Sequence, residues 1–290
     1  MSEQLPLYRR IRRSVYYFLT LLILKIFQVI PDKTGKAICR YLVRLAIKIK
    51  PEYLELARQN MKLAIPDEDQ EPLIADMISR LGDNIHDSLQ LPNNLSNLLQ
   101  SVSCNQDVVD RLQEGGVLIL TGHFGCWELL GAWLAETCDG LTVVTGTIHN
   151  KPVDDLVNQQ RRDRGITPVR RDGDLRPIIG ALKSGSAVAV LMDQNNPVEN
   201  MMIPFFGVPA PTSVGFAKLA MKYKVPILPL SIKRTDFGFD VIAGDLIDIN
   251  RYYETNDAVG LLKECNLALE KMVSSNPAEW VWFHRRWGIN

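Results

Sequence analysis

The sequence lacks several features that mark common protein classes. Its five cysteines are scattered over 290 residues without a C-x2-C pair, which argues against a disulfide framework and a zinc ribbon. Lys plus Arg and Asp plus Glu balance at 33 each, so there is no overall basic field for nucleic acid. No P-loop, G-x-G-x-x-G, H-E-x-x-H or G-x-S-x-G motif occurs. We therefore expect no nucleic-acid partner, no metal and no serine hydrolase chemistry.

The amino terminus departs from that of an ordinary soluble enzyme. Four arginines between residues 9 and 13 precede a mainly apolar stretch from Val15 to Ile30, and no A-x-A-like cleavage site follows. The stretch is short for a span and carries Lys25 near its middle, where a charge costs about 2.5 to 3.5 kcal/mol. Arginines beside anionic headgroups add about 1 kcal/mol each of attraction. We expect residues 1–32 to form a membrane-anchoring helix, interfacial or tilted across the bilayer; the alternative is a core helix with solvated arginines.

Two further regions follow this segment. From residue 33 to 112 the apolar residues recur at three- and four-residue spacing, and prolines at 51 and 66 separate the helices. We interpret the region as helical and packed on the remaining chain, with 93–106 as a connection. After residue 113 short apolar runs alternate with helical patterns, which predicts an α/β fold with a sheet flanked by helices. We expect strands near 117–122, 142–148, 167–171, 187–193, 226–232 and 239–244.

A histidine and a glutamate stand at the end of the first expected strand. "HFGCWE" places His123 and Glu128 where a helix begins, and ligands in open α/β sheets collect beyond the carboxyl ends of strands. The helix amino terminus disfavours imidazolium, whereas a carboxylate favours it and can hold the ring by a hydrogen bond. Such a pair could act as a general base on a hydroxyl, although a lone histidine at a strand end is more often structural.

Seven segments in order carry a resemblance to a known family. They are "YRR", "ARQNMKLAIPD", "GVLILTGHFGCWELLG", "NQQRRDRG", "VLMDQN", "PFFGVPAPTSVGFAKLA" and "PAEWVWFHRRW". The H-x4-[D/E] motif and its setting resemble the lysophospholipid acyltransferase superfamily. More closely, the chain resembles the lipid A biosynthesis acyltransferases, the late lauroyl and myristoyl transferases. The resemblance implies that residues 113–290 form an acyltransferase core of mixed sheet and flanking helices.

The resemblance also implies an activity. His123 would take a proton from a lipid hydroxyl as its oxygen attacks an acyl thioester, and Glu128 would orient and charge-stabilise the imidazole. The donor would be acyl-acyl carrier protein, or acyl-coenzyme A as in some relatives, with no cofactor beyond this co-substrate. The acceptor would be a lipid A precursor at the cytoplasmic face of the bacterial inner membrane. A lysophospholipid, an ornithine lipid or a glycosylated phospholipid remains an alternative acceptor, and a non-catalytic lipid-binding module remains an alternative function.

Three other segments supply expected binding residues. The family keeps arginine in "NQQRRDRG", so one of three guanidiniums would hold phosphate or an oxyanion; the alternative is a solvated helix end. The family also keeps the Asp-Gln that closes an apolar strand, which we expect at the active site. Two phenylalanines in a Gly/Pro-rich loop either plug the core or border an acyl-chain groove. These predicted substrate-binding and groove residues are Arg161, Arg162, Arg164, Asp193, Gln194, Phe205 and Phe206.

Overall fold

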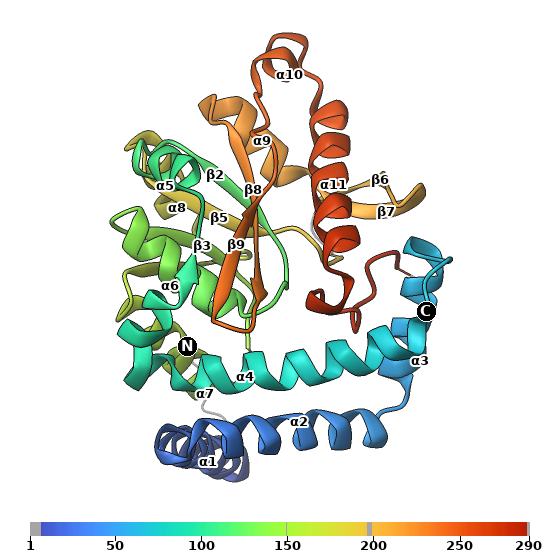
Figure 1. Ribbon diagram of the computed structural model, residues 1–290. Helices are drawn as coiled ribbons and strands as arrows, with labels where there is room; N and C mark the ends of the chain where they lie inside the picture. Colours follow the sequence, from blue (N-terminus) through green and yellow to red (C-terminus); the bar gives the residue numbers. More distant parts are fainter. Residues whose placement is uncertain (1–6, 149, 196–198, 289–290) are drawn as a thin grey trace.

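The computed structural model describes residues 7–148, 150–195 and 199–288 and shows a mixed α/β fold. Seven strands form one sheet in the order β1-β9-β8-β2-β5-β3-β4 (Figure 1). Neighbouring strands are parallel except for β8 and β9, which are antiparallel. Their bounds are Val102–Ser103 (β1), Leu118–Thr121 (β2), Leu141–Thr145 (β3), Ile166–Arg170 (β4), Ala187–Leu191 (β5), Ile227–Arg234 (β8) and Phe239–Ala243 (β9). The expected α/β class with a mixed sheet is confirmed.

Helices cover both faces of this sheet. Their apolar faces meet the sheet in two clusters, because successive residues of β2 point to opposite sides: Leu118 and Leu120 join one cluster and Ile119 the other. The helices that follow β1 are α5 (Gln106–Gln113), α6 (Trp127–Thr137), α7 (Lys151–Arg162), α8 (Arg176–Lys183), α9 (Val214–Tyr223), α10 (Asn250–Thr255) and α11 (Ala258–Ser275), with a 3-10 turn at Pro277–Glu279.

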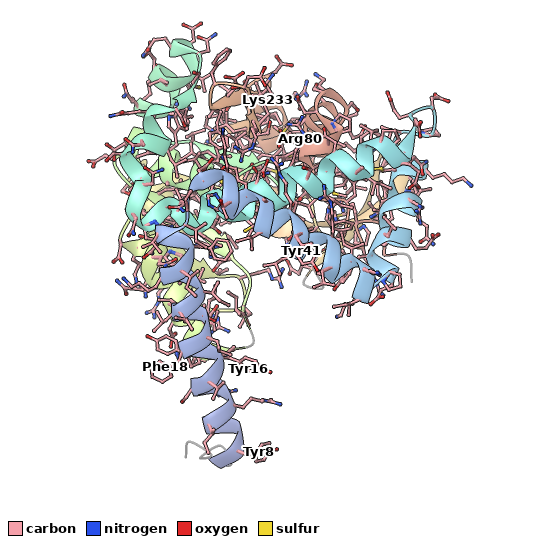
Figure 2. All side chains as sticks on the ribbon, turned by 60° about the horizontal axis from the view of Figure 1, so that its bottom comes forward. Tyr8, Tyr16, Phe18, Tyr41, Arg80 and Lys233 are labelled. Carbon is pink, nitrogen blue, oxygen red and sulfur yellow. The ribbon has the colours of Figure 1, made fainter. Side chains whose placement is uncertain are left out.

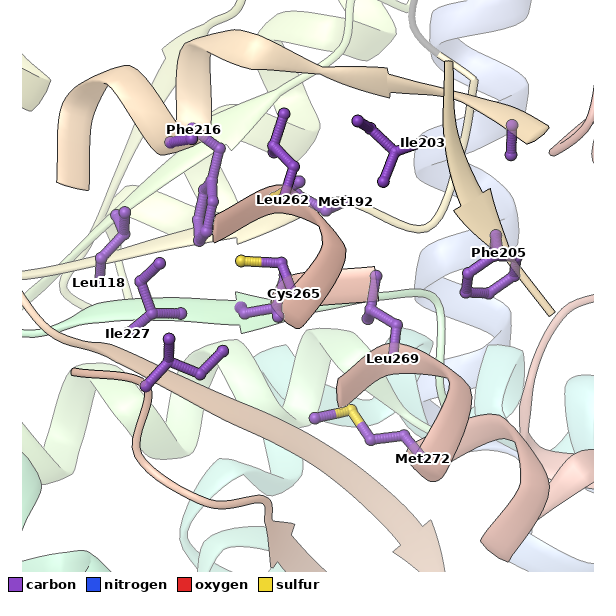
Figure 3. Packing of buried hydrophobic residues seen from close by; sticks show 14 of the residues in the cluster. Leu118, Met192, Ile203, Phe205, Phe216, Ile227, Leu262, Cys265, Leu269 and Met272 are labelled. Atoms are coloured by element: carbon purple, nitrogen blue, oxygen red, sulfur yellow. The ribbon is translucent and has the colours of Figure 1, made fainter. Parts of the chain in front are cut away.

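The longest carboxyl-terminal helix fills one face of the sheet. Helix α11 contributes Leu262, Cys265 and Leu269 to the cluster that also contains Leu118 of β2 and Ile227 of β8 (Figure 3). All five side chains are fully buried. Burial of an aliphatic side chain of this size contributes about 1.5 to 3 kcal/mol, so this cluster holds α11 against the central strands. The chain that leaves α11 is thereby directed toward the carboxyl ends of β2 and β5.

Four helices precede the sheet. They are α1 (Leu7–Val29), α2 (Asp32–Ile49), α3 (Glu52–Ala64) and α4 (Gln70–Gln100). Helices α1 and α2 form an outer layer against α4 (Figure 1), and α1 runs away from the rest of the chain toward Tyr8 (Figure 2). Among the described residues, no helix combines the length and apolar character needed to cross a membrane.

Two local expectations are wrong. Helix α4 continues past Pro92 to Gln100, with one non-helical residue at Asn94. The first part of the region 93–106, expected as a connection, is therefore helical. Residues 200–213, expected as a loop, form an antiparallel hairpin of β6 (Asn200–Phe205) and β7 (Val208–Ser213). Prolines are tolerated in this hairpin because a two-stranded ribbon consists of edge strands only. In addition, β1 precedes the expected boundary at 113 and pairs with β9, so the sheet draws on both regions.

The turn after β2 depends on a glycine. Gly125 has φ +49°, and a Cβ there would lie 2.2 Å from the carbonyl oxygen of Ile232 in β8. Side chains with a Cβ rarely adopt positive φ, and the neighbour is backbone that cannot move aside. Gly125 therefore lets the chain turn from β2 into α6 while touching β8.

We predict that Gly125→Ala lowers the free energy of unfolding by more than about 1 kcal/mol. Gly180→Ala is the matched control, because Gly180 lies inside α8 and a Cβ there meets nothing within 4 Å. The control should gain about 0.5 to 1 kcal/mol from helix propensity. Urea denaturation followed by circular dichroism measures both changes, and equal effects of the two variants would refute the close approach.

Candidate active site

The register of two parallel strands brings His123 and Asp193 together. Thr121 of β2 is paired with Leu191 of β5, and His123 and Asp193 each lie two residues beyond the end of these strands. Gly122 permits the approach, since a Cβ at this position would lie 2.8 Å from Cβ and Cγ of Asp193. The site therefore stands at the carboxyl edge of the sheet, as expected for an α/β fold.

Asp193 holds both the backbone and the ring of His123. Its Oδ2 accepts a hydrogen bond from the backbone N–H of His123 at 2.8 Å, and Oδ1 lies 3.0 Å from Nδ1 of the ring. The indole N–H of Trp280 also donates to Oδ2, at 2.9 Å. A carboxylate can only accept hydrogen bonds, so Nδ1 carries the proton and Nε2 keeps its lone pair. This is the tautomer that a general base requires.

Burial and charge set the protonation of this pair. Burial alone lowers the pKa of His123, but the charge and hydrogen bond of Asp193 outweigh it, helped by Glu128, so that the pKa is raised above its ordinary value. Burial alone raises the pKa of Asp193, but the charge and hydrogen bonds of His123 outweigh it and hold the pKa well below its usual range. Asp193 stays ionised, and His123 can accept a proton and be stabilised while it carries it.

The expected hydrogen bond between Glu128 and His123 is replaced by a different pairing. Glu128, in the first turn of α6, accepts hydrogen bonds from the guanidinium of Arg161 in α7, with Nε and Oε2 3.2 Å apart. Asp193 is the carboxylate that bonds the histidine ring, because strand register places it there, whereas Glu128 is paired with Arg161. Glu128 acts on His123 through its charge rather than through a hydrogen bond.

The other predicted polar residues divide between the site and the surface. Arg161 and Gln194 line the same cavity as His123, and the amide of Gln194 lies 3.2 Å from Nδ1 of the histidine. Arg162 is exposed and bonds Gln159 on its own helix. Arg164 is half-buried, and burial lowers its pKa despite the nearby charge of Glu128. Arg161 is thus the arginine that reaches the site.

A cavity of about 730 Å³ opens beside His123 and passes between two strands. Pairing of β3 with β5 ends at Val143 and Ala189, although β3 stays paired with β4 as far as Thr145. Where β3 and β5 separate, the cavity is lined by consecutive residues of both strands and by side chains from both faces of the sheet. Glu128 lines the cavity from the first turn of α6, and beyond it the lining on the α6 face includes the apolar residues Leu130, Gly131, Leu134, Leu141, Val143 and Ile166.

The predicted groove residues Phe205 and Phe206 lie outside the lining of this cavity. Phe205 is fully buried at the end of β6, where its ring contacts those of Phe206, Trp280 and Trp287. Pairing of β6 with β7 turns this side chain toward the core, because inward residues alternate along a strand. The two phenylalanines therefore plug the core behind the site.

The carboxyl-terminal segment completes the site, which the sequence did not reveal. Gly125 N–H donates to the carbonyl of Glu279 at 2.9 Å, and Val281 N–H donates to the carbonyl of His123 at 3.1 Å. These bonds align the segment with the turn after β2 and bring Trp280 onto Asp193. A buried tryptophan needs a partner for its N–H, but sequence alone does not identify that partner.

Two further clusters bear on the chemistry. Cys126 is buried behind the motif, and burial raises the pKa of its thiol to about 12, which leaves it un-ionised and a poor nucleophile. Asp32, His86 and Asp87 place one possible metal-ligating atom each within 4.8 Å of one another. Arg234 and Lys36 form ion pairs with Asp87, so cationic side chains already balance this group.

Comparison with known proteins places the chain in a family. The model of the bacterial lipid A biosynthesis acyltransferases matches residues 4–288. The chain belongs to this family. It is 25% identical over 181 residues to a lipid A biosynthesis palmitoleoyltransferase of Escherichia coli, covering 61% of this chain and 57% of that protein. It is 21% identical over 178 residues to a phosphatidylinositol mannoside acyltransferase of Mycobacterium tuberculosis, covering 59% and 54%. The chain thus spans a little over half the length of these relatives.

A histidine must be neutral to accept a proton, so if His123 is the base of an acyl transfer, we predict that the rate falls as the pH drops through its raised pKa. Asp193→Asn removes the charge that raises this pKa. The acid limb of the pH–rate profile should therefore move to lower pH, while the plateau kcat falls about 10²- to 10⁴-fold because the ring loses its charge partner.

The control for this prediction is Asp172→Asn, which removes a carboxylate that pairs with Arg170 on the surface. Its profile should match that of the unchanged protein. A normal plateau and an unshifted limb in Asp193→Asn would contradict the role assigned to this carboxylate.

Proposed function

We propose that the protein transfers a fatty acyl chain from a thioester to the hydroxyl of a membrane lipid. The observation that carries this proposal is an imidazole with a free Nε2, fixed by a buried carboxylate, at an apolar cavity of about 730 Å³. An oriented base beside a cavity of this kind suits a substrate with one reactive polar group and a long hydrocarbon chain.

The proposed reaction uses this geometry directly. The acceptor oxygen attacks the thioester carbonyl carbon while Nε2 of His123 takes the hydroxyl proton. The new C–O bond forms, the C–S bond breaks, and the proton passes from Nε2 to the leaving thiolate. Asp193 bonds Nδ1 and stabilises the imidazolium between these two transfers. Each proton and electron pair is accounted for without a further reactant.

The Arg161–Glu128 pair supports a second part of the proposal. Arg161 lines the cavity and bonds Glu128, and each side chain of the pair is 21% exposed. Glu128 contributes negative charge near His123, and the remaining N–H groups of Arg161 suit the developing oxyanion or a substrate phosphate. Arg164, whose charge lies near the same glutamate, adds to the field that an anionic headgroup meets.

The acyl chain is proposed to enter the gap between β3 and β5. Its hydrocarbon would lie against the apolar residues on the α6 face, from Leu130 to Ile166. The lining on the other side includes Glu199 and Ser213, which suit the more polar part of the donor. Gly131 contributes no side chain to this wall and so leaves room for the chain.

Family membership supports the choice of substrates. We propose acyl-acyl carrier protein as donor and a lipid A precursor as acceptor, because a lipid A biosynthesis palmitoleoyltransferase is among the relatives. Neither a metal nor an organic cofactor is required by the proposed steps. The matching phosphatidylinositol mannoside acyltransferase favours a glycosylated phospholipid as the second candidate acceptor.

Exposed apolar side chains support attachment to the membrane. Helix α2 exposes Tyr41, Leu42, Leu45 and Ile49, which lie on one face. Helix α1 exposes Tyr16 and Phe18 among many others, and Figure 2 shows these rings and Tyr41 on the outer layer. With basic residues beside them, such faces suit an anionic interface. We propose that both helices rest on the cytoplasmic face of the inner membrane.

The first test is acyl transfer by the purified full-length protein in detergent micelles. The substrates are a mixed-length acyl-acyl carrier protein pool and a Kdo-bearing lipid A precursor, and mass spectrometry detects the product. We predict a product heavier by one acyl chain, with kcat reduced at least about 10²-fold in His123→Ala.

The outcomes separate the parts of the proposal. Transfer to a mannosylated phosphoinositide but not to the lipid A precursor would replace the acceptor and keep the chemistry. Transfer at the normal rate by His123→Ala would refute the mechanism.

A second test concerns the membrane surface of α2. The double change Leu42→Glu/Leu45→Glu should weaken binding to vesicles of phosphatidylethanolamine and phosphatidylglycerol by about tenfold or more, since it removes apolar contact and adds repulsion. The matched control is Leu246→Glu/Leu267→Glu, which changes leucines of 45% and 55% exposure away from α1 and α2. Co-sedimentation measures both, and equal binding would exclude α2 from the docking surface.

A further inference from the structure

A second imidazole lies behind the carboxylate of the site. The side chain of His284 is 10% exposed, and its Nε2 stands 3.9 Å from Oδ2 of Asp193. Neither ring nitrogen has a hydrogen-bond partner among the described residues. The ring meets that of Trp280 edge to face, with centroids 4.8 Å apart. A buried polar ring in contact with the carboxylate that orients the base calls for a physical role.

The surroundings of Asp193 show where His284 acts. Oδ2 accepts the backbone N–H of His123 and the indole N–H of Trp280, and Nδ1 of the histidine ring lies 3.0 Å from Oδ1 and 3.2 Å from Oδ2. Nε2 of His284 approaches Oδ2, the oxygen that also accepts the two N–H groups. A polar group there changes the strength with which the carboxylate attracts the proton on His123, without touching a substrate.

We propose that His284 is a positioning residue that sets the basicity of His123 through Asp193. Its uncharged ring adds a polar edge beside Oδ2, in addition to the N–H groups of His123 and Trp280. The ring thereby weakens the attraction of Asp193 for the proton on His123 without neutralising the carboxylate. The catalytic consequence rests on the proposed function, because it assumes that His123 is the base.

The groups that face His284 keep it uncharged. The pKa of His284 is lowered to about 4, because burial and the charges of His123 and Arg286 together outweigh the opposing charge of Asp193. Arg286 is fully buried and donates to the carbonyl of Pro211 and to side-chain oxygens of Thr212 and Asn266. This fixed guanidinium disfavours a second cation beside it. A charged His284 would compete with His123 for the single carboxylate.

The position of His284 is fixed from another part of the chain. Nδ2 of Asn60, a fully buried residue of α3, donates to the carbonyl oxygens of Trp282 at 2.9 Å and His284 at 2.7 Å. These bonds hold the segment against the amino-terminal helices. They fix the backbone of His284, while the edge-to-face contact with Trp280 packs its ring beside Asp193.

The test is a series of three variants of the full-length protein in detergent micelles. The ring of His123 is titrated by nuclear magnetic resonance after ¹⁵N-histidine labelling, its signals assigned by their loss in His123→Asn. His284→Phe removes the polar edge, so the pKa of His123 should rise by about half a unit, because Asp193 becomes more basic. His284→Lys adds a cation beside Asp193, so the pKa should fall by about one unit. His284→Gln keeps an uncharged N–H and should resemble the unchanged protein.

The acid limb of kcat/KM should shift in the same directions. A merely structural role would change melting temperature or kcat without this signed series. If His284→Lys does not fold, the comparison of Phe with Gln still decides. An unchanged pKa of His123 in His284→Phe, or equal shifts in the Phe and Gln variants, would overturn the proposal. The titration needs no substrate, so its result stands even if acyl transfer to lipid is not found.

Discussion

The active site depends on one buried carboxylate that gathers N–H groups from distant parts of the chain. Asp193 accepts from the backbone and ring of His123 after β2 and from Trp280 near the carboxyl terminus. A buried anion is tolerated only when such donors surround it. The same contacts that stabilise the charge therefore also fix the tautomer and direction of the base. Three features bring these donors to Asp193: the strand register, the missing Cβ of Gly122 and the carboxyl-terminal segment.

The cavity follows from an interruption of the sheet. Strands β3 and β5 pair only as far as Val143 and Ala189, and the space beyond them reaches both faces of the sheet. A continuous sheet would leave substrate only the strand ends, whereas this gap lets hydrocarbon pass into the core beside the base. The amino-terminal helices make two contributions. Asn60 of α3 holds the carboxyl-terminal segment, and α1 and α2 supply the exposed apolar layer.

Much of the fold and part of the site could be predicted from the sequence. Apolar runs bounded by glycine marked the main strands, the strand-end rule located His123, and the family resemblance indicated Asp193 at the end of another strand. The pairing of Glu128 with Arg161 could not be predicted, because a spacing of five residues from His123 does not determine which neighbour the Glu128 side chain meets. The β6–β7 hairpin was not predicted because its prolines are typical of loops, and without its register the sequence did not decide whether Phe205 plugs the core or borders a groove. Long-range contacts such as Trp280 with Asp193 leave no local pattern.

The most direct test of this account is the position of the acyl chain in the protein. An acyl-carrier-protein thioester bearing a diazirine at the far end of its chain can be photolysed with the protein, and the labelled peptide identified by mass spectrometry. The account predicts labelling on the α6 side of the gap, at the cavity-lining residues Leu130, Gly131, Leu134, Leu141, Val143 or Ile166. Labelling confined to Phe205 and Phe206 or to α1, with none at those positions, would contradict it.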